Sequence, residues 1–445
     1  MPIDRFVPSR RSVLKAAGVS AALAALPHWF VEQMLDAAEP KPPTSANDKP
    51  DVALIGCGGR GRADAHEASK YCNIVAVCDV HDHHAQGASM EFGEAKPYKD
   101  FRKLLERDDI PIVINATPDH WHTLVNLAAM KAGKDVYSEK PLTLTIDEGK
   151  HVVDAVERTG RILQTGTQQR SDPNFRLAAE LIRNNRLGKL QEVNVWLPAG
   201  LKGGPFPAQP VPDGLDWDFW LGQAPKVDYV PERGDFRFRY WYDYSAGTMT
   251  DWGAHHNDIV QWALGMDDSG PVEIEGKPTS DLVPGGYTAY SEYQIDYLYA
   301  NGVPLHVRTT TNDSWGGAYL NKTPGAQHNG IKFVGADGWI WVTRGKIEAS
   351  KPEILHDALP SDAVRLHVSD DHKADFFQSV RTRQQPVCPA EVGHRSASVC
   401  HLGAISTRLG RTLRWDPQKE QFVGDDEANQ WLARKQRKPW TYDSV

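Results

Sequence analysis

Residues 51–61 read D-V-A-L-I-G-C-G-G-R-G, a short apolar run followed at once by spaced glycines. The apolar run predicts a buried strand, and residues 62–68 predict a helix. Gly56 allows a tight turn, Gly58 lets the backbone approach a pyrophosphate, and Gly61 permits close helix–strand packing. The helix N-terminus offers free N–H groups to the phosphates, so the stretch predicts a dinucleotide-binding turn. The loop residues expected to bind this cofactor are Gly56, Gly58, Gly59, Arg60 and Gly61.

A second apolar strand, residues 74–78, ends in Asp79, 18 residues after Gly61. An acid at this place accepts hydrogen bonds from ribose hydroxyls and repels a 2′-phosphate, so the sequence favours NAD. NADP stays open as an alternative, because the guanidinium groups of Arg60 and Arg62 could hold that phosphate. The other interpretation of Asp79 is a simple helix N-cap.

Strand and helix patterns alternate along the rest of this region. Residues 111–117 and 135–138 predict buried strands, and residues 124–132 between them predict an apolar helix. Such alternation predicts an α/β Rossmann domain with a doubly wound parallel sheet, over residues 51–170. Ligands bind such sheets at the carboxyl ends of the strands. The residues expected to reach the cofactor from these strand ends are Thr117, Pro118, His122, Glu139 and Lys140.

Four motifs occur in order along the chain. They are the glycine loop, T-P-D-H-W-H at 117–122, S-E-K-P at 138–141 and S-A-G-T-M-T-D-W-G-A-H at 245–255. Together they resemble the Gfo/Idh/MocA oxidoreductases, the family of glucose–fructose oxidoreductase and inositol dehydrogenase. The resemblance implies a nicotinamide-dependent oxidoreductase whose second domain covers the nicotinamide site and often forms the oligomer interface. It is not specific for a substrate.

Oxidation of a sugar hydroxyl needs a base at the hydroxyl and a cation near the developing alkoxide. Lys140, at a strand end and directed by Pro141, is predicted to supply the cation; the alternative is a surface lysine. Asp251 and His255 are spaced to share one helix face. His255 is predicted to be the general acid/base, because its ordinary pKa lies near working pH. Asp251 is expected to hold or charge-stabilise the site or, alternatively, only to cap the helix, and the resemblance implies the same pairing.

Three further residues are predicted to contact substrate. Arg170 follows the crossover into the second domain, and Tyr244 precedes the D-x-G-x-H run, with core packing as the alternative. His256 is the weaker candidate, because it points about 100° away from His255 on a helix. No metal is predicted, since no H-x-x-x-H or H-E-x-x-H run supports a site at His120, His122, His255 and His256.

Residues 171–445 predict an α+β domain with a large, mostly antiparallel sheet. Hairpins are indicated at 297–307 and 332–342, with Asn-Gly and Asp-Gly turns. Residues 200–231, rich in Gly and Pro, predict a long loop. The domain is expected to bind substrate and to form a homo-oligomer, as the resemblance implies.

The N-terminal segment is expected to be a targeting signal and not part of the folded protein. In residues 1–38, Arg10 and Arg11 precede a short apolar stretch, which is typical of a twin-arginine export signal; a surface amphipathic helix is the alternative. Residues 39–50 form a Pro-rich linker, and the folded protein is expected to begin at Asp51. We therefore expect a periplasmic protein that meets the twin-arginine translocation machinery and carries a cofactor loaded in the cytoplasm.

The composition of the chain argues against two other classes of protein. The chain has 445 residues and a net charge of −8, which argues against a dedicated nucleic-acid binder. It has no apolar run of about 18 residues, so no membrane span is expected. The sequence thus predicts an exported NAD-dependent oxidoreductase of a sugar, cyclitol or glycoside, with a tightly held cofactor. The alternatives are a redox-neutral NAD-dependent glycoside hydrolase and a non-catalytic sugar-binding module.

Overall fold

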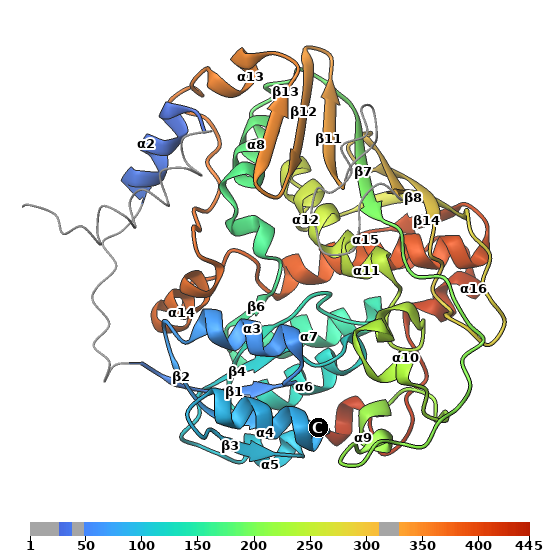
Figure 1. The fold of residues 1–445 in the computed structure, drawn as a ribbon. Coiled ribbons are helices and arrows are strands. Elements are labelled where there is room, and N and C mark those ends of the chain that lie inside the picture. The colour runs from blue at the N-terminus through green and yellow to red at the C-terminus, as the bar shows by residue number, and fades with distance from the viewer. Residues whose placement is uncertain (1–25, 38–48, 311–328) are drawn as a thin grey trace, which may run out of the picture.

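Two β-sheets organise the protein in this computed structural model, which describes residues 26–37, 49–310 and 329–445 (Figure 1). The first sheet has six parallel strands in the order β3-β2-β1-β4-β5-β6. Its central strands β4 and β5 are fully buried, as expected where helices cover both faces of a parallel sheet. The predicted Rossmann sheet is confirmed. Its strands are β1 Asp51–Ile55, β2 Asn73–Cys78, β3 Lys96–Tyr98, β4 Ile112–Asn115, β5 Asp135–Ser138 and β6 Leu163–Thr165.

The helices of the first domain connect these parallel strands. The strand order reverses between β1 and β4, and dinucleotides bind such sheets at this switch point. The loops after β1, β4 and β5 therefore meet at one edge. The helices are α3 Gly59–Ala68, α4 Asp82–Glu91, α5 Phe101–Leu105, α6 Asp119–Lys131 and α7 Ile146–Thr159.

The second sheet has nine strands in the order β13-β12-β11-β7-β10-β9-β8-β14-β15. Only β7 and β10 run parallel among its described pairs, and both predicted hairpins, β9–β10 and β11–β12, are confirmed. The mostly antiparallel sheet expected for this domain is therefore present. Its strands are β7 Leu190–Pro198, β8 Pro271–Pro278, β9 Tyr293–Tyr299, β10 Pro304–Thr310, β11 Gly330–Gly335, β12 Gly338–Thr343, β13 Lys346–Ala349, β14 Leu413–Asp416 and β15 Gln421–Phe422.

Helices α8, α12 and α15 bury one face of this sheet in a common apolar core. Helix α15 also contacts α7, so it joins the two domains (Figure 1). The predicted long loop at 200–231 contains the short helix α9. The described helices from residue 168 onward are η2 Gln168–Ser171, α8 Pro173–Arg183, α9 Trp217–Leu221, α10 Pro231–Gly234, η3 Phe236–Tyr240, α11 Thr248–Asp251, α12 Gly253–Leu264, α13 Pro352–His356, α14 His372–Thr382, α15 Ala390–Leu409, α16 Asp426–Asn429, η4 Gln430–Leu432 and η5 Tyr442–Ser444.

The other face of the second sheet carries apolar side chains that are half-buried or exposed. Trp196, Trp339 and Trp341 are half-buried there, and Leu298 is 40% exposed. The homo-oligomer stays a prediction.

Helix α2, His28–Ala37, corrects the expected start of the folded protein. Phe30 is fully buried in the core of the second domain, with the Arg176 guanidinium 4.2 Å from its ring. Trp29 Nε1 donates to the Leu355 carbonyl at 3.2 Å. The expectation that folding begins at Asp51 is therefore wrong, because this helix is part of the second domain's core. The arginine pair at residues 10–11 lies outside the described residues.

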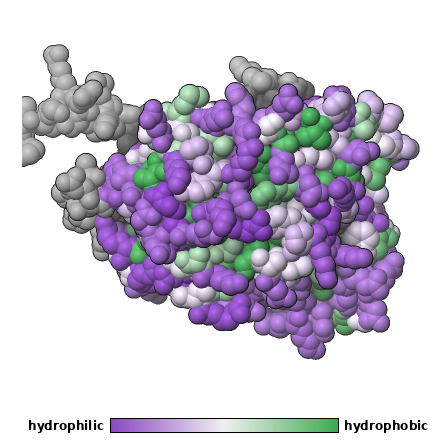
Figure 2. All heavy atoms as spheres, turned by 90° about the horizontal axis from the view of Figure 1, so that it is seen from below, coloured by the Kyte–Doolittle hydropathy of each residue, from purple (hydrophilic) through white to green (hydrophobic). Residues whose placement is uncertain are grey.

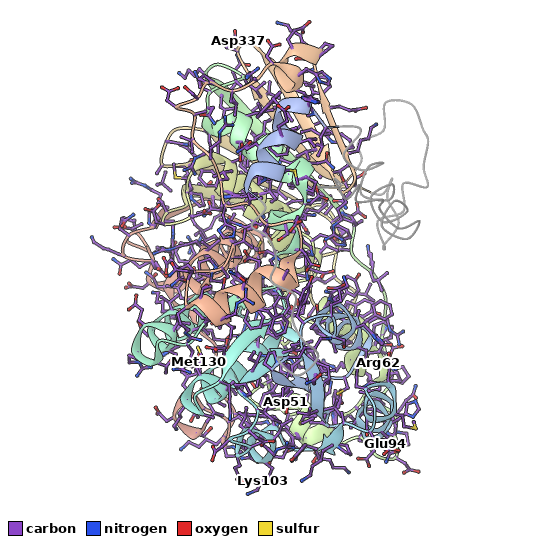
Figure 3. All side chains as sticks on the ribbon, turned by 90° about the vertical axis from the view of Figure 1, so that its left-hand side faces the viewer. Asp51, Arg62, Glu94, Lys103, Met130 and Asp337 are labelled. Carbon is purple, nitrogen blue, oxygen red and sulfur yellow. The ribbon has the colours of Figure 1, made fainter. Side chains whose placement is uncertain are left out.

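The C-terminal tail returns to the first domain, where Trp440 packs against Phe101, Trp121 and Phe219. Seen from below, the surface of this end of the molecule is mainly hydrophilic (Figure 2). Within the described ranges, no helix has the length and apolar character to cross a membrane. In Figure 3 the labelled side chains mark the two ends, with Asp337 at one end and, in the first domain, Asp51, Arg62, Glu94, Lys103 and Met130.

Candidate active site

The glycine loop between β1 and α3 forms an open cradle. A Cβ atom on Gly56, whose φ is +89°, would lie 2.5 Å from the Ala116 carbonyl oxygen, and one on Gly61 would lie 1.9 Å from the Gly56 oxygen. Cβ atoms on Gly58 or Gly59 would meet only open space. Because no side chain caps α3 at Gly58, its first N–H groups are left for a ligand. These features fit a dinucleotide pyrophosphate.

Asp79 lies beside this cradle with its carboxylate fixed by backbone donors. Oδ2 accepts from the Cys57 N–H and Oδ1 from the His81 N–H, both at 2.8 Å. The cap of α4 is His81, so the alternative of Asp79 as a simple N-cap is wrong. His84 Nδ1 lies 3.6 Å from Oδ2, and this interaction raises the pKa of His84. The arrangement suits an acceptor for ribose hydroxyls.

The loops after β4 and β5 are tied together by His122. Its Nδ1 lies 2.7 Å from the Pro141 oxygen and its Nε2 lies 2.8 Å from the Thr117 oxygen. Because His122 is buried and uses both ring nitrogens inside the protein, it supports the loops instead of binding the cofactor as predicted. Thr117 and Pro118 remain half-buried at the rim.

Glu139 belongs to a buried group of charges beneath the loops. Arg60 Nε lies 3.2 Å from Glu139 Oε1, and Arg60 also pairs with Asp64. Lys373 of α14 reaches Asp64 Oδ1 at 2.5 Å, so the second domain neutralises part of this group. Burial raises the pKa of Glu139, but the charges of Arg60 and Lys140 outweigh it and the net pKa is lowered. Glu139 is therefore ionised.

Lys140 and Asp251 form an ion pair between the two domains. The Lys140 ammonium also donates to the Asp251 carbonyl at 3.3 Å, and each side chain is only 10% exposed. Burial raises the pKa of Asp251, but the charges of Lys140 and Arg239 outweigh the effect of burial, so the pKa is lowered overall. Asp251 ends α11, whose cap is Gly247, so the interpretation of Asp251 as a mere helix cap is wrong.

His255 lies on α12, one turn after Asp251, and is buried. Its Nδ1 has no hydrogen-bond partner in the part of the chain that the structure describes. Burial lowers the pKa of His255 well below its usual value, and the charges of Arg344 and Lys140 reinforce the shift. The imidazole is therefore neutral and can accept a proton from a hydroxyl.

Sequence reasoning missed two cations near this pair. Arg239 of η3 places Nε 3.5 Å from Asp251 Oδ1. Arg344, in the β12–β13 turn, lies with its guanidinium 4.8 Å from the Trp252 ring. The sequence does show Arg239 as a charged residue within the aromatic run 236–244. No motif, however, indicates that its side chain points toward Asp251.

Three predicted substrate residues lie in buried contacts instead. The Arg170 guanidinium pairs with Asp258 at 2.8 Å and with Asp267 at 2.7 Å. The fully buried Tyr244 hydroxyl accepts from Arg233 at 2.8 Å. His256 Nε2 lies 2.8 Å from Asn329 Oδ1, and burial lowers the pKa of His256 to about 3. These partners give Arg170, Tyr244 and His256 structural roles, which corrects the prediction.

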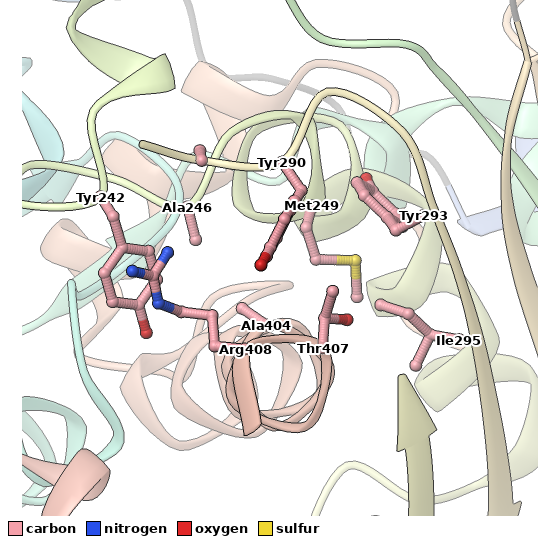
Figure 4. Close-up of a pocket in the computed structure, with 10 residues that line it drawn as sticks. Tyr242, Ala246, Met249, Tyr290, Tyr293, Ile295, Ala404, Thr407 and Arg408 are labelled. Atoms are coloured by element: carbon pink, nitrogen blue, oxygen red, sulfur yellow. The ribbon is translucent and has the colours of Figure 1, made fainter. Parts of the chain in front are cut away.

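Two cavities lie in the second domain. A small one of about 20 Å³ lies between α11 and α15, with Met249, Thr407 and Arg408 among its lining residues (Figure 4). An open pocket of about 520 Å³ is lined by Phe206, Trp241 and other residues. Neither is lined by Lys140 or His255. Over the described ranges, no group of three or more His, Cys, Asp or Glu side chains is placed to hold a metal ion.

Two family models match the chain. The model described as oxidoreductase family, NAD-binding Rossmann fold, matches residues 51–167. The model described as oxidoreductase family, C-terminal alpha/beta domain, matches residues 200–337 and 343–442. The six-stranded parallel sheet and the glycine cradle thus place the protein in a class of oxidoreductase folds that have an NAD-binding Rossmann domain. The chain belongs to the Gfo/Idh/MocA oxidoreductase family.

Curated relatives match about a third of the chain. Glycosyl hydrolase family 109 protein 2 of Shewanella sp. (strain ANA-3) is 36% identical over 171 residues, which are 34% of this chain and 38% of the relative. Alpha-N-acetylgalactosaminidase of Shewanella oneidensis is 30% identical over 170 residues, 34% of this chain and 37% of the relative. The chain therefore spans less than two fifths of the length of these relatives.

Solved structures share the fold over most of the chain. The WlbA dehydrogenase from Bordetella pertussis, in complex with NADH and UDP-GlcNAcA, has a TM-score of 0.61 at 17% identity and covers 83% of this chain and 99% of its own. Levoglucosan dehydrogenase with NADH and levoglucosan has a TM-score of 0.60 at 17% identity, covering 82% and 99%. At these identities the likeness concerns the fold.

Proposed function

We propose that the protein is an NAD-dependent oxidoreductase acting on a CH–OH group of a sugar, cyclitol or glycoside. The observation that carries the proposal is the Lys140–Asp251 ion pair, with His255 one turn further on, at the strand edge that holds the dinucleotide cradle. NAD, when bound, supplies the hydride acceptor.

The chain's own residues then have separate tasks. The N–H groups of the glycine loop bind the pyrophosphate, and Asp79 accepts from the ribose hydroxyls. The Lys140 ammonium donates to the substrate oxygen and stabilises negative charge on it, while the neutral His255 imidazole takes the hydroxyl proton. Asp251 orients Lys140. The alcohol carbon loses a hydride and the oxygen loses a proton, which gives a carbonyl product.

We further propose that the protein is exported by the twin-arginine route with NAD already held tightly. Arg10 and Arg11 before an apolar stretch support export. The burial of Leu26 and Phe30 in the core of the second domain favours a leader that ends before Leu26. NAD released when the purified protein is denatured, without added cofactor, supports tight binding; protein that yields no nicotinamide contradicts it.

A second candidate function is redox-neutral glycoside hydrolysis, in which a transient oxidation labilises the glycosidic bond. The names of the curated relatives, which match about a third of the chain, favour it. The same site could start either reaction, because both begin by removing a hydride and a proton.

One experiment separates the candidates. Free sugars, cyclitols and chromogenic glycosides, including N-acetylgalactosaminides, are each mixed with protein carrying bound NAD. Reduced-nicotinamide absorbance that accumulates with a free sugar supports the oxidoreductase. Aglycone release without accumulation supports the hydrolase. Sugar binding with neither signal, unchanged in Lys140→Met, would leave a non-catalytic binding module.

A further inference from the structure

Asp251 is bound by two cations from different domains. Lys140 follows strand β5 of the first domain, and Arg239 belongs to η3 of the second. Both approach the same oxygen, Asp251 Oδ1, with Arg239 Nε at 3.5 Å. The three side chains are 10%, 19% and 10% exposed for Lys140, Arg239 and Asp251, so water screens this group weakly.

The local charge of this group depends on Arg239. With Arg239, two cations share one carboxylate and the three side chains carry one net positive charge. Without it, Lys140 and Asp251 form a neutral pair in which the carboxylate alone holds the ammonium. An oxygen that becomes an alkoxide is stabilised by net positive charge and by an ammonium free to donate to it.

The charge of Arg239 acts on carboxylates of both domains. Besides Asp251, the acids that act on its charge are Asp119 and Glu139. Glu139 is already paired with Arg60, and Asp119 Oδ2 accepts from the Ser245 hydroxyl at 2.5 Å. Asp251 itself is acted on by Lys140, Arg239 and the more distant Arg344. The charge of Arg239 therefore acts on Asp119 in the T-P-D-H loop of the first domain as well as on Asp251 of the second.

We propose that Arg239 is a positioning residue that acts through Asp251: it shares the carboxylate so that the Lys140 ammonium can donate to the substrate oxygen. This role rests on the proposed function, because it assigns Lys140 to that oxygen. It also gives Arg239 a different task from the neighbouring Arg237, which pairs with Asp235 and Glu232.

The proposal is tested in the full-length protein with bound NAD. The variants are Arg239→Gln, Arg239→Lys and the matched control Arg237→Gln. In Arg239→Gln, kcat for the most active sugar of the panel should fall about 100-fold, while KM and the dissociation constant of NAD change less than about threefold. Arg239→Lys should recover most of the loss. The acid limb of the kcat–pH profile should move to higher pH in Arg239→Gln, because Asp251 loses one of the two cations that lower its pKa. Arg237→Gln should match the parent protein.

A second measurement needs no substrate. Acetylation of Lys140 by acetic anhydride, followed by peptide mass spectrometry, should be slower in Arg239→Gln, because the ammonium is then held by Asp251 alone. If the parent protein oxidises no sugar, the proposed function fails and this rate alone decides the role of Arg239. An unchanged rate, an unmoved acid limb, or a loss of kcat that follows weaker NAD binding or a lower melting temperature would overturn the proposal.

Discussion

The Lys140 ammonium and the Asp251 carboxylate form an ion pair although they are 111 residues apart in the chain. Each residue belongs to a motif of its own, and the contact exists only when the two domains are folded together. The pair therefore marks the place where the cofactor domain and the substrate domain share one site.

In Lys140→Met, the rate at which a sugar reduces bound NAD should fall about 100- to 1,000-fold, because the substitution removes the cation at the developing alkoxide. The affinity for NAD should stay nearly unchanged, since the glycine loop and Asp79 remain. Stopped-flow absorbance of the reduced nicotinamide measures the rate, and fluorescence quenching measures NAD binding. Full activity in Lys140→Met would show that the ammonium takes no part in the chemistry.

The acid limb of the pH profile reports on His255 together with Asp251, because Arg344 lowers the pKa of both groups. Only the neutral imidazole accepts a proton, and burial together with Arg344 and Lys140 lowers its pKa well below 6.5. Activity should therefore persist as pH falls from neutral to below 6.5, and Arg344→Gln should move the acid limb of kcat/KM upward. Arg344→Lys, which keeps the charge, is the matched control. An acid limb at or above the ordinary pKa of histidine would contradict the assignment.

Asp79 should set the choice of cofactor. Asp79→Asn keeps the size of the side chain but removes the charge, so NAD binding should weaken by about 1.5–3 kcal/mol as charge-assisted bonds to the ribose are lost. NADP should bind better relative to NAD, because repulsion of the 2′-phosphate disappears. Titration calorimetry with both cofactors measures the two changes. Equal losses for NAD and NADP would argue against a ribose contact.

Glu148 should make stability depend on pH. Burial raises its pKa to about 7, although it accepts from Leu144 N–H at 2.8 Å and from the Thr123 hydroxyl at 2.9 Å. The folded state therefore holds a proton that the unfolded state releases near pH 4.5. Stability from this group is present at low pH and is lost as pH rises toward about 7, by up to about 3 kcal/mol.

Urea unfolding of the parent protein and of Glu148→Gln checks this slope. The free energy of unfolding of Glu148→Gln, relative to the parent, should rise between about pH 5 and pH 8, because the amide stays neutral throughout. Parallel pH dependences would mean that the Glu148 carboxyl is solvated in the folded protein.

Helix α2 should contribute to the stability of the second domain. Phe30→Ala should cost about 3–5 kcal/mol of unfolding free energy, since the ring is fully buried in the core. His28→Ala, at a side chain that is 89% exposed, serves as the control and should be near neutral. Equal stability of the two variants would mean that α2 does not pack on the second domain in solution.

The first domain was predictable because its key residues are determined by contacts close by in the chain or in the adjacent strand. A Cβ at Gly56 or Gly61 meets backbone within a few residues or the adjacent strand, so the spacing of the glycines already specifies the turn. Asp79 follows the same logic, because one donor, Cys57, follows the neighbouring strand β1 and the other, His81, lies only two residues further along the chain. Hairpins with Asn-Gly and Asp-Gly turns were predictable for the same reason.

Residues that depend on distant partners were not predictable. Arg170 is predicted from the sequence to contact substrate, but its carboxylate partners Asp258 and Asp267 lie 88 and 97 residues further on. Arg239 was missed because only the tertiary fold brings it to Asp251. Helix α2 was assigned to the leader because it directly follows the apolar, alanine-rich stretch at 13–26, whose composition does not mark where a leader ends.

Transfer of a labelled hydride tests the central claim most directly. A sugar that is active in the panel, deuterated at the carbon to be oxidised, is mixed with protein carrying bound NAD, and the cofactor is released and analysed by mass spectrometry. We expect the deuterium on the nicotinamide ring in the parent protein and almost none in Lys140→Met. Unlabelled NAD in the parent protein after the sugar has been converted would contradict hydride transfer at this site.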